Sequence, residues 1–488
     1  MTNRVALSVV ERFAFAGGYE FGTVGAYERL VGRAHFAVDP AGAAQRGITD
    51  LDKAPTDGDG LAHFTGDFSI LKPADPARGN CRLFFDYGNR GNKRMLQFFN
   101  DAPASNDPRT LAQAGNGFLM RRGYTVAWLA WQGDLLPGNG RLLLDLPVAR
   151  ERHGPVTGLV RTEYIADRSG ITVFPLSGRV SVRSHPTVSL DPREARLTRR
   201  RYPYDEREAV PPENWCFARV EGGTGLDNQG AVQAVVPSDS HIYIPGGFEP
   251  GWIYELVYTA RDPLVLGLGH VVVRDFVSFL RYGKEDAAGR LNPLCERDRT
   301  IEKAYAWGRS QTGRYLRDFV YRGFNADTAG RKVFDGILPH VAGAGRMWLN
   351  HGIVKEPPDI VAGSDYTILV PAVDADGNDR AGVRAPMVAA PLGTYCGWNL
   401  RARGFGHGAM HEFSASYIPL PETPEERRAT GDPRRSILER YQNAEAYVRA
   451  ITAAARRLVE QGLMLEEDVE RAAEVAADWG RPRHDIGL

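Results

Sequence analysis

Ser310 is the residue whose surroundings best fit a catalytic nucleophile. It stands in Gly308-Arg-Ser-Gln-Thr-Gly313, after the apolar run 304–307 and before apolar residues at helical spacing from Tyr315 to Val320. A strand, a sharp turn and a helix would hold the serine hydroxyl at the carboxyl edge of a sheet, as in a nucleophile elbow. The usual spacing is G-x-S-x-G, whereas here Thr312 occupies the place of the second glycine. The alternative role of Ser310 is an ordinary helix N-cap.

A glycine-containing loop could complete an oxyanion site beside this serine. The run Cys81–Asp86 predicts a buried strand, which leads into Tyr87-Gly-Asn-Arg-Gly-Asn92. A tetrahedral intermediate needs two N–H donors, and an elbow supplies only one of them. We expect Gln311 to be the first donor and Gly88 or Asn89 the second. A plain connecting loop remains the alternative.

The base and the acid have several candidates. His340 ends a short apolar run that begins at Val333, so it would lie near the elbow, as a base or as a supporting residue. The order Ser, Asp, His that is typical of elbow enzymes would also be met by Asp374 or Asp376 with His407 or His411. The segment around Asp376 equally resembles a surface turn.

No metal or cofactor is expected. His407 and His411 are four residues apart, but no third ligand is near and Gly408 disfavours a helix there. The pair Gly267 and Gly269 lacks the third glycine of a dinucleotide loop. The four cysteines are far apart in the sequence and form no C-x-x-C pair, so we expect reduced side chains.

Charge and hydropathy limit the partners. The 488 residues contain 60 Lys+Arg and 60 Asp+Glu, so no overall charge favours nucleic acid or an acidic membrane. No apolar run approaches the roughly 18 residues of a membrane span. We therefore expect a cytoplasmic protein with a small-molecule partner, no nucleic acid and no membrane. The oligomeric state is open.

The elements that must position these residues alternate between strands and helices. We expect β-like pieces at 31–38, 64–71, 366–373 and 387–390, a parallel crossover from the strand at 81–86 to that at 123–131, and a helix through Val272 to Leu280. Arginines at 196–201 indicate a solvated face. The predicted parts are a β-rich N-terminal part (1–75), the first part of the core (76–140), a β-rich insertion (141–245), the core with the elbow (246–351), a Pro/Gly-rich region without evident helix (352–432) and C-terminal helices (433–488).

Several motifs together resemble a little-characterised group of bacterial α/β-hydrolase-domain proteins. The resemblance covers nearly the whole chain and includes the following stretches: Asp86–Gly91, Gly246–Gly251, Gly308–Arg317, Phe334–Gly336, Pro339–Arg346, Pro391–Arg401 and Gly431–Arg434. It implies an α/β-hydrolase-type fold with a mostly parallel sheet, and Ser310 as the nucleophile of a carboxylic-ester hydrolase.

The resemblance is interrupted after His351 and resumes with a later part of the family. In the family, a longer stretch there carries the last core strands with the acid and the histidine, and this chain continues directly with Gly352. The loss of those strands would leave apolar surface exposed. Two hypotheses follow: a serine esterase with an acyl-enzyme on Ser310, or a catalytically impaired binding protein that lacks the acid and the histidine.

Overall fold

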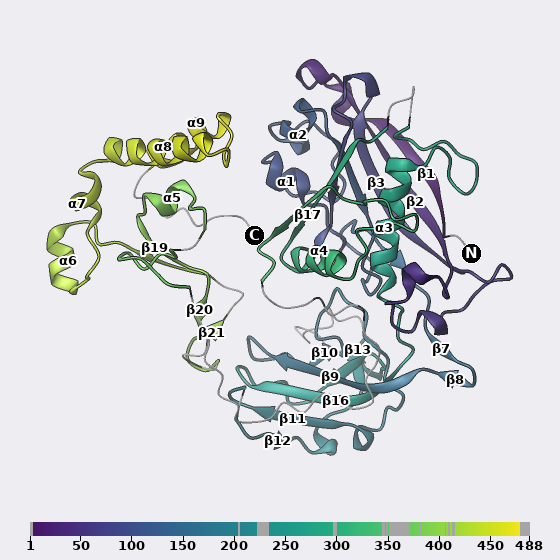
Figure 1. The fold of residues 1–488 in the computed structure, drawn as a ribbon. Coiled ribbons are helices and arrows are strands. Elements are labelled where there is room, and N and C mark those ends of the chain that lie inside the picture. Colours follow the sequence, from purple (N-terminus) through teal and green to yellow (C-terminus); the bar gives the residue numbers. More distant parts are fainter. Residues whose placement is uncertain are drawn as a thin grey trace. The chain divides into compact units, whose positions relative to one another are not determined.

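The computed structural model describes two compact units. The first comprises Met1–Arg200 and Glu206–Ile360, and the second Arg201–Asp205 and Val361–Leu488 (Figure 1). The described residues are 3–203, 205–221, 234–295, 300–343, 347, 350, 371–380, 382–405, 407, 410–411 and 415–478.

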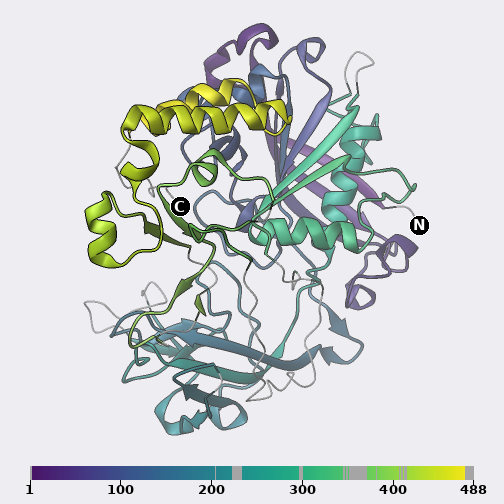
Figure 2. The same cartoon turned by 60° about the vertical axis from the view of Figure 1, so that its left-hand side comes forward.

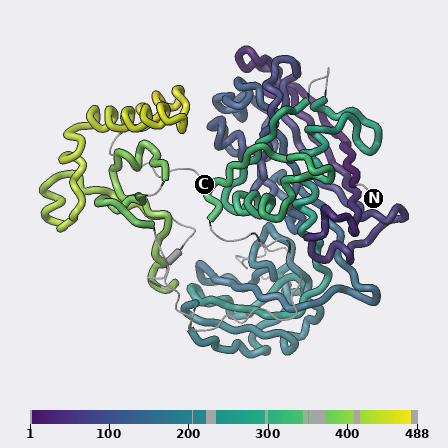
Figure 3. Tube along the Cα trace, viewed as in Figure 1, coloured from purple at the N-terminus to yellow at the C-terminus, as the bar shows by residue number. Residues whose placement is uncertain are grey.

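The first unit is built on a mixed eight-stranded sheet of order β1-β2-β3-β5-β4-β17-β18, with β6 also paired to β3. The pairs among β1, β2, β3 and β5 are antiparallel, and those among β5, β4, β17 and β18 are parallel. Figure 3 traces the chain from the purple N-terminal strands of this sheet. The strands are β1 (Arg4–Ala14), β2 (Tyr27–Val38), β3 (Ala62–Pro73), β4 (Arg82–Asp86), β5 (Thr125–Leu129), β6 (Leu144–Asp145), β17 (Lys303–Arg309) and β18 (Gly336–His340).

The parallel half of the sheet confirms the crossover expected from the sequence. All of β5 and all of β4 after Arg82 are buried, which explains why these strands read as continuous apolar runs. The β-rich N-terminal part belongs to the same sheet, because β3 pairs with β5. It is therefore an extension of the core.

Helices cover both faces of the sheet. They are α1 (Met95–Phe99), α2 (Phe118–Arg121), α3 (Leu268–Tyr282) and α4 (Gln311–Tyr321). Phe98 and Phe99 of α1 pack on Trp307, with ring centroids 5.3 and 5.4 Å away. The next strand residue, Gly308, lies against α4. Because successive strand residues point to opposite faces, α1 and α4 lie on opposite faces of the sheet.

The insertion has its own sheet, of order β12-β11-β16-β9, and a second hydrophobic cluster that includes Tyr164, Leu197 and Tyr258. It extends beyond the expected end at residue 245, because β16 is one of its strands. The strands are β7 (Arg150–Glu151), β8 (Gly154–Pro155), β9 (Thr157–Ile165), β10 (Val173–Pro175), β11 (Arg196–Arg200), β12 (Glu208–Ala209), β13 (Ala218–Val220), β14 (Val235–Pro237), β15 (His241–Tyr243) and β16 (Ile253–Arg261).

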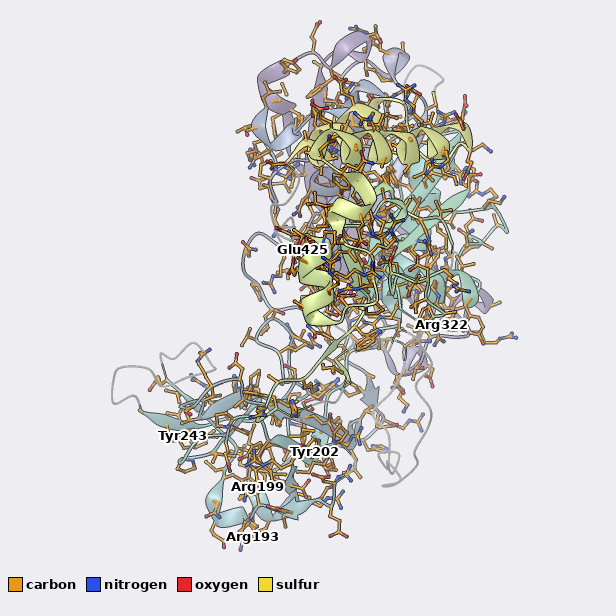
Figure 4. The ribbon with its side chains drawn as sticks, turned by 90° about the vertical axis from the view of Figure 1, so that its left-hand side faces the viewer. Arg193, Arg199, Tyr202, Tyr243, Arg322 and Glu425 are labelled. Atoms are coloured by element: carbon orange, nitrogen blue, oxygen red, sulfur yellow. The ribbon has the colours of Figure 1, made fainter. Side chains whose placement is uncertain are left out.

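The arginine run of β11 is only partly solvated. Arg199, labelled in Figure 4, pairs with Glu208 and Glu249 near the surface. Arg200 is 2% exposed and pairs with the buried Glu255 at 3.2 Å. The expectation of a solvated face was wrong for Arg200, because strand alternation places it toward the neighbouring strand's carboxylate.

The second unit combines short antiparallel pairs with helices. Residues 387–389 lie in a helix and were wrongly expected to be β-like, since Pro386 at the first turn begins α5. The two long C-terminal helices are confirmed, and α8 and α9 are drawn in yellow in Figure 2. The elements are β19 (Gly393–Cys396), β20 (Asn399–Leu400), β21 (Met410–His411), β22 (Ser416–Pro419), α5 (Pro386–Ala389), α6 (Pro424–Thr430), α7 (Ile437–Tyr441), α8 (Ala444–Glu460) and α9 (Glu467–Ala477).

Candidate active site

Ser310 lies in the turn between β17 and α4 in a conformation that L-residues rarely adopt. Its φ is 57° and its ψ is −113°, and its N–H donates to the His340 carbonyl at 2.9 Å. Its side chain makes no capping hydrogen bond, although the residue occupies the N-cap position. Backbone strain of this kind costs about 1–3 kcal/mol and persists where the surrounding structure enforces it, often at functional sites. This backbone conformation suits the predicted elbow, and within the described ranges the Ser310 hydroxyl forms no hydrogen bond.

The structure explains the unusual glycine spacing around Ser310. A Cβ on Gly308 would lie 2.4 Å from the Thr312 carbonyl oxygen, and one on Gly313 would lie 2.8 Å from that of His340. Thr312 is buried; its hydroxyl accepts from the Arg309 N–H at 2.8 Å and donates to the Arg309 carbonyl at 3.0 Å. The Thr312 hydroxyl therefore connects the first turn of α4 to the end of β17. The position at which α4 comes too close to β18 for a Cβ is residue 313.

The expected oxyanion donors are backbone N–H groups at the start of α4 and in the loop after β4. Gln311 is the first residue of α4, so its N–H has no acceptor within the helix. The loop after β4 is held against the elbow by the Asn89 side-chain amide, which donates to the Arg309 carbonyl at 3.2 Å. The N–H of Gly88 donates to the Asp86 carbonyl at 3.0 Å, so Gly88 is not the free donor that the sequence suggested.

The N–H of Asn89 is the better-placed donor of this loop. Trp131 donates its indole N–H to the Gly88 carbonyl at 2.8 Å. That carbonyl and the Asn89 N–H belong to one planar trans peptide and point in opposite directions. Trp131 follows β5, and β4 lies between β5 and β17. The Asn89 N–H therefore points away from the Trp131 indole, and no acceptor for it is found among the described residues.

His340 ends β18, in register with Arg309. Its ring lies 6.1 Å from the Phe98 ring and 6.2 Å from the Trp307 ring, centroid to centroid, on the face covered by α1. Burial and the nearby Arg309 charge lower the pKa of the imidazole, which keeps it neutral at pH 7. Its backbone carbonyl, which binds the Ser310 N–H, is its contact with the elbow. In the described ranges no hydrogen bond joins its ring to Ser310.

The other candidate base and acid lie in the second unit. His407 is exposed in a turn, and the side chain of His411 falls outside the described residues. The Asp376 carboxylate pairs with Arg440 of α7, with Nη1–Oδ2 at 2.9 Å. Asp374 accepts hydrogen bonds from the N–H groups of Asp376 and Asn378, as in the alternative of a surface turn. Ser310 belongs to the first unit and these four residues to the second, so their assignment as base and acid stays a prediction.

Asp86 is a site residue to which the sequence analysis assigned no role. Its buried Oδ2 accepts from the N–H groups of Arg94 and Met95 at 2.8 Å and from the Trp128 indole at 2.7 Å, whereas Oδ1 has no described partner. Burial, partly offset by these bonds, raises the pKa of Asp86 to about 6. The signal was available in the sequence: an aspartate that ends an apolar strand, directly before a glycine loop.

A cavity of about 400 Å³ opens between the end of β5 and the insertion. Its wall is mainly apolar and includes Leu136, Val182 and Leu264, with Asp134 and His241 among the polar groups. Ser310 does not line this cavity in the described part of the chain. The cavity is a second feature of the first unit, separate from the elbow.

No metal centre accompanies these groups within the described ranges, where no three His, Cys, Asp or Glu side chains are grouped to hold an ion. None of the helices in those ranges combines the length and the apolar character that a membrane crossing requires. The four cysteines are free and partly buried.

A family model described as an alpha/beta hydrolase domain matches residues 240–365 and residues 346–474. The first range contains the elbow, and the two ranges overlap at 346–365, close to the point where the sequence suggested a missing segment. The match supports an α/β-hydrolase family and a hydrolase of a general kind. Searches of curated proteins and of solved structures found no match.

Proposed function

We propose that this protein is a serine hydrolase that cleaves carboxylic esters through an acyl-enzyme on Ser310. The observation that carries the proposal is the strained Ser310 backbone at the start of α4, with a hydroxyl that caps nothing. A residue that only terminated a helix would use its oxygen for a capping bond and would need no left-handed φ.

The proposed reaction has two steps. The Ser310 hydroxyl attacks the ester carbonyl while a histidine takes its proton, and the alkoxide leaves as the alcohol after protonation by that histidine. The N–H groups of Gln311 and Asn89 hold the oxyanion in the tetrahedral intermediate. Water, deprotonated by the same base, then cleaves the acyl-enzyme and releases the acid.

For the base and the acid we propose His407 and Asp376, with His340 as the alternative base. Chain order supports the first pair. For His340, its position at the end of the strand next to β17 and its neutral imidazole are the supporting features. Substitution of each histidine by glutamine would identify the base, because only the loss of the base lowers the turnover of p-nitrophenyl acetate by several orders of magnitude.

The nucleophile is tested by two matched serines. Both Ser310 and Ser436 are N-cap residues, but Ser436 forms a complete capping box with Glu439. Ser310→Ala should abolish labelling by a fluorophosphonate in intact-mass spectrometry and leave the free energy of unfolding within about 0.5 kcal/mol. Ser436→Ala should keep the label and lose about 1 kcal/mol.

The contrary outcomes are equally clear. A folded wild-type protein that takes up no label, or a label that survives Ser310→Ala, would contradict the proposed nucleophile. The first result would favour the catalytically impaired binding protein.

A further inference from the structure

Arg90 is a half-buried arginine in the proposed oxyanion loop. It follows Asn89 in the short 3₁₀ turn Asn89–Gly91, with φ 52°. Burial, in the first place, lowers the pKa of its guanidinium. A charge that has lost part of its hydration needs an anionic partner, yet in the described ranges the Arg90 guanidinium forms no ion pair. The loop beside Ser310 thus holds an uncompensated positive charge.

Three more arginines add to that charge. Arg179, Arg141 and Arg314 all act on Arg90 by Coulombic repulsion, which also lowers its pKa. Arg314 belongs to the first turn of α4, where its N–H donates to the Ser310 carbonyl at 3.0 Å. None of the three pairs with a carboxylate of the described residues. The repulsion among these cations remains unless a ligand neutralises it.

One carboxylate attracts this group, and its own surroundings disfavour its charged form. Asp134 attracts Arg90, but it is buried, and burial raises the pKa of its carboxyl group. One of its oxygens is already used by the Gln132 amide at 2.8 Å. The positive charge therefore exceeds the negative charge at the carboxyl edge of the sheet, next to the nucleophile.

The same loop borders the apolar cavity. A Cβ on Gly91 would lie 3.1 Å from both Leu135 Cδ1 and Arg141 Cβ, so the loop packs against the segment that supplies the cavity wall. Asp134 and Leu136, on either side of Leu135, both line the cavity. The loop that carries Arg90 thus contacts the elbow through Asn89 and packs against a segment that lines an apolar space large enough for a small acyl or alkyl group.

We propose that the ester substrate carries a carboxylate, which Arg90 binds with the help of Arg141, Arg179 and Arg314, while an apolar part of the substrate occupies the cavity. This inference rests on the proposed ester hydrolysis, because it takes the bound carboxylate to be part of the substrate. Carboxylate binding itself does not require Ser310. Arginine suits the role because its planar guanidinium can bind a carboxylate in a bidentate manner.

The first experiment measures binding without chemistry. Isothermal titration of the Ser310→Ala protein should detect hexanoate but not hexanol or hexylammonium at matched concentration, and added salt should weaken the binding. Arg90→Gln should weaken hexanoate binding by about ten- to a hundredfold. Arg152→Gln, in an exposed turn of the insertion, is the matched control and should leave it unchanged. Equal binding of hexanoate and hexanol to the Ser310→Ala protein, in which Arg90 is unchanged, would overturn the inference.

The second experiment separates this inference from the proposed function. Monomethyl adipate and methyl hexanoate have the same methyl ester on six-carbon acyl chains, and only the first has a free carboxylate. We expect Arg90→Gln to lower kcat/KM for monomethyl adipate by at least about tenfold relative to methyl hexanoate. Equal effects on both esters would refute carboxylate recognition and leave the esterase intact. Hexanoate binding without turnover of either ester would refute the esterase and support the anion site.

Discussion

At the scale of single residues, Asp86 binds the segment that directly follows the proposed oxyanion loop. Its Oδ2 accepts three hydrogen bonds, while its Oδ1 is buried without a described partner. The folded pKa of about 6 is above the ordinary value of 3.8, so the folded state binds the proton more tightly than the unfolded chain. Its contribution to stability is complete below pH 3.8 and is lost as the pH rises to about 6.

Asp86→Asn tests this linkage. From pH 3.8 to 6 the free energy of unfolding of the wild type should fall by about 2 kcal/mol relative to the variant, because one pKa unit corresponds to 1.36 kcal/mol and each state is half titrated at its own pKa. Chemical denaturation at several pH values measures it. Asp191→Asn is a control of opposite sign: the Arg193 hydrogen bond lowers the pKa of Asp191 to about 2, so that contribution disappears as the pH falls below 3.8. A difference between wild type and Asp86→Asn that does not depend on pH would contradict the assignment.

Trp131 binds the peptide that carries the proposed second oxyanion donor, the Asn89 N–H. Trp131→Phe removes the hydrogen bond to the Gly88 carbonyl and frees the Gly88–Asn89 peptide to rotate, so fluorophosphonate labelling of Ser310 should slow by about tenfold or more. Trp215→Phe is the matched control, since Trp215 is also buried but its indole N–H has no partner in the described ranges. Equal labelling rates for the two variants would show that the bond to Gly88 has no catalytic role.

At the scale of elements, the elbow depends on how closely α4 approaches β18. Gly313 lies where a Cβ would be 2.8 Å from the backbone oxygen of His340, and backbone cannot move aside as a side chain can. The apolar periodicity from Tyr315 onward predicted the helix, but it could not show which glycine faces a neighbouring strand. Spacing along the chain does not report contacts between elements.

Gly313→Ala should therefore destabilise the first unit by about 1–3 kcal/mol, as overpacking does, and reduce labelling of Ser310. Gly246→Ala, where a Cβ would meet open space, should change the free energy of unfolding by less than about 0.5 kcal/mol. Thermal and denaturant unfolding of both variants would measure the difference. A stable, fully labelled Gly313→Ala protein would contradict the tight approach.

At the scale of the whole molecule, β18 is the last strand of the central sheet within the described ranges, next to β17. In the described ranges β18 pairs with β17 alone, and its Leu338 side chain is 43% exposed. The segment predicted to be missing would follow this strand in the sequence, after His351, and its loss stays a prediction. Pro339 within β18 removes one N–H from the edge, which limits pairing with other chains.

We expect this edge to bind apolar probes and to promote self-association. Leu338→Lys should reduce fluorescence of the dye ANS and light scattering on concentration, because a charge on an edge strand opposes association. Leu111→Lys, at a site with 45% exposure elsewhere in the first unit, should have a smaller effect. If both substitutions act equally, the edge is not a special surface.

Patterns along the chain predicted the local elements and the turn at Ser310. Apolar runs and helical spacing predicted β4, β5, β17, α3 and α4, because burial imposes a period that neighbouring residues reveal. The turn at Ser310 was recognisable for the same reason, since its strand, glycine and helix are contiguous.

Tertiary structure decided what depends on residues distant in the chain. The commitment of the Gly88 N–H to Asp86, the orientation of the Asn89 N–H by Trp131, the burial of Arg200 against Glu255 and the excess of arginines around Arg90 all arise from contacts between separate segments. Hydrogen bonds, burial and Coulombic forces act through space, so the order of residues alone does not specify them.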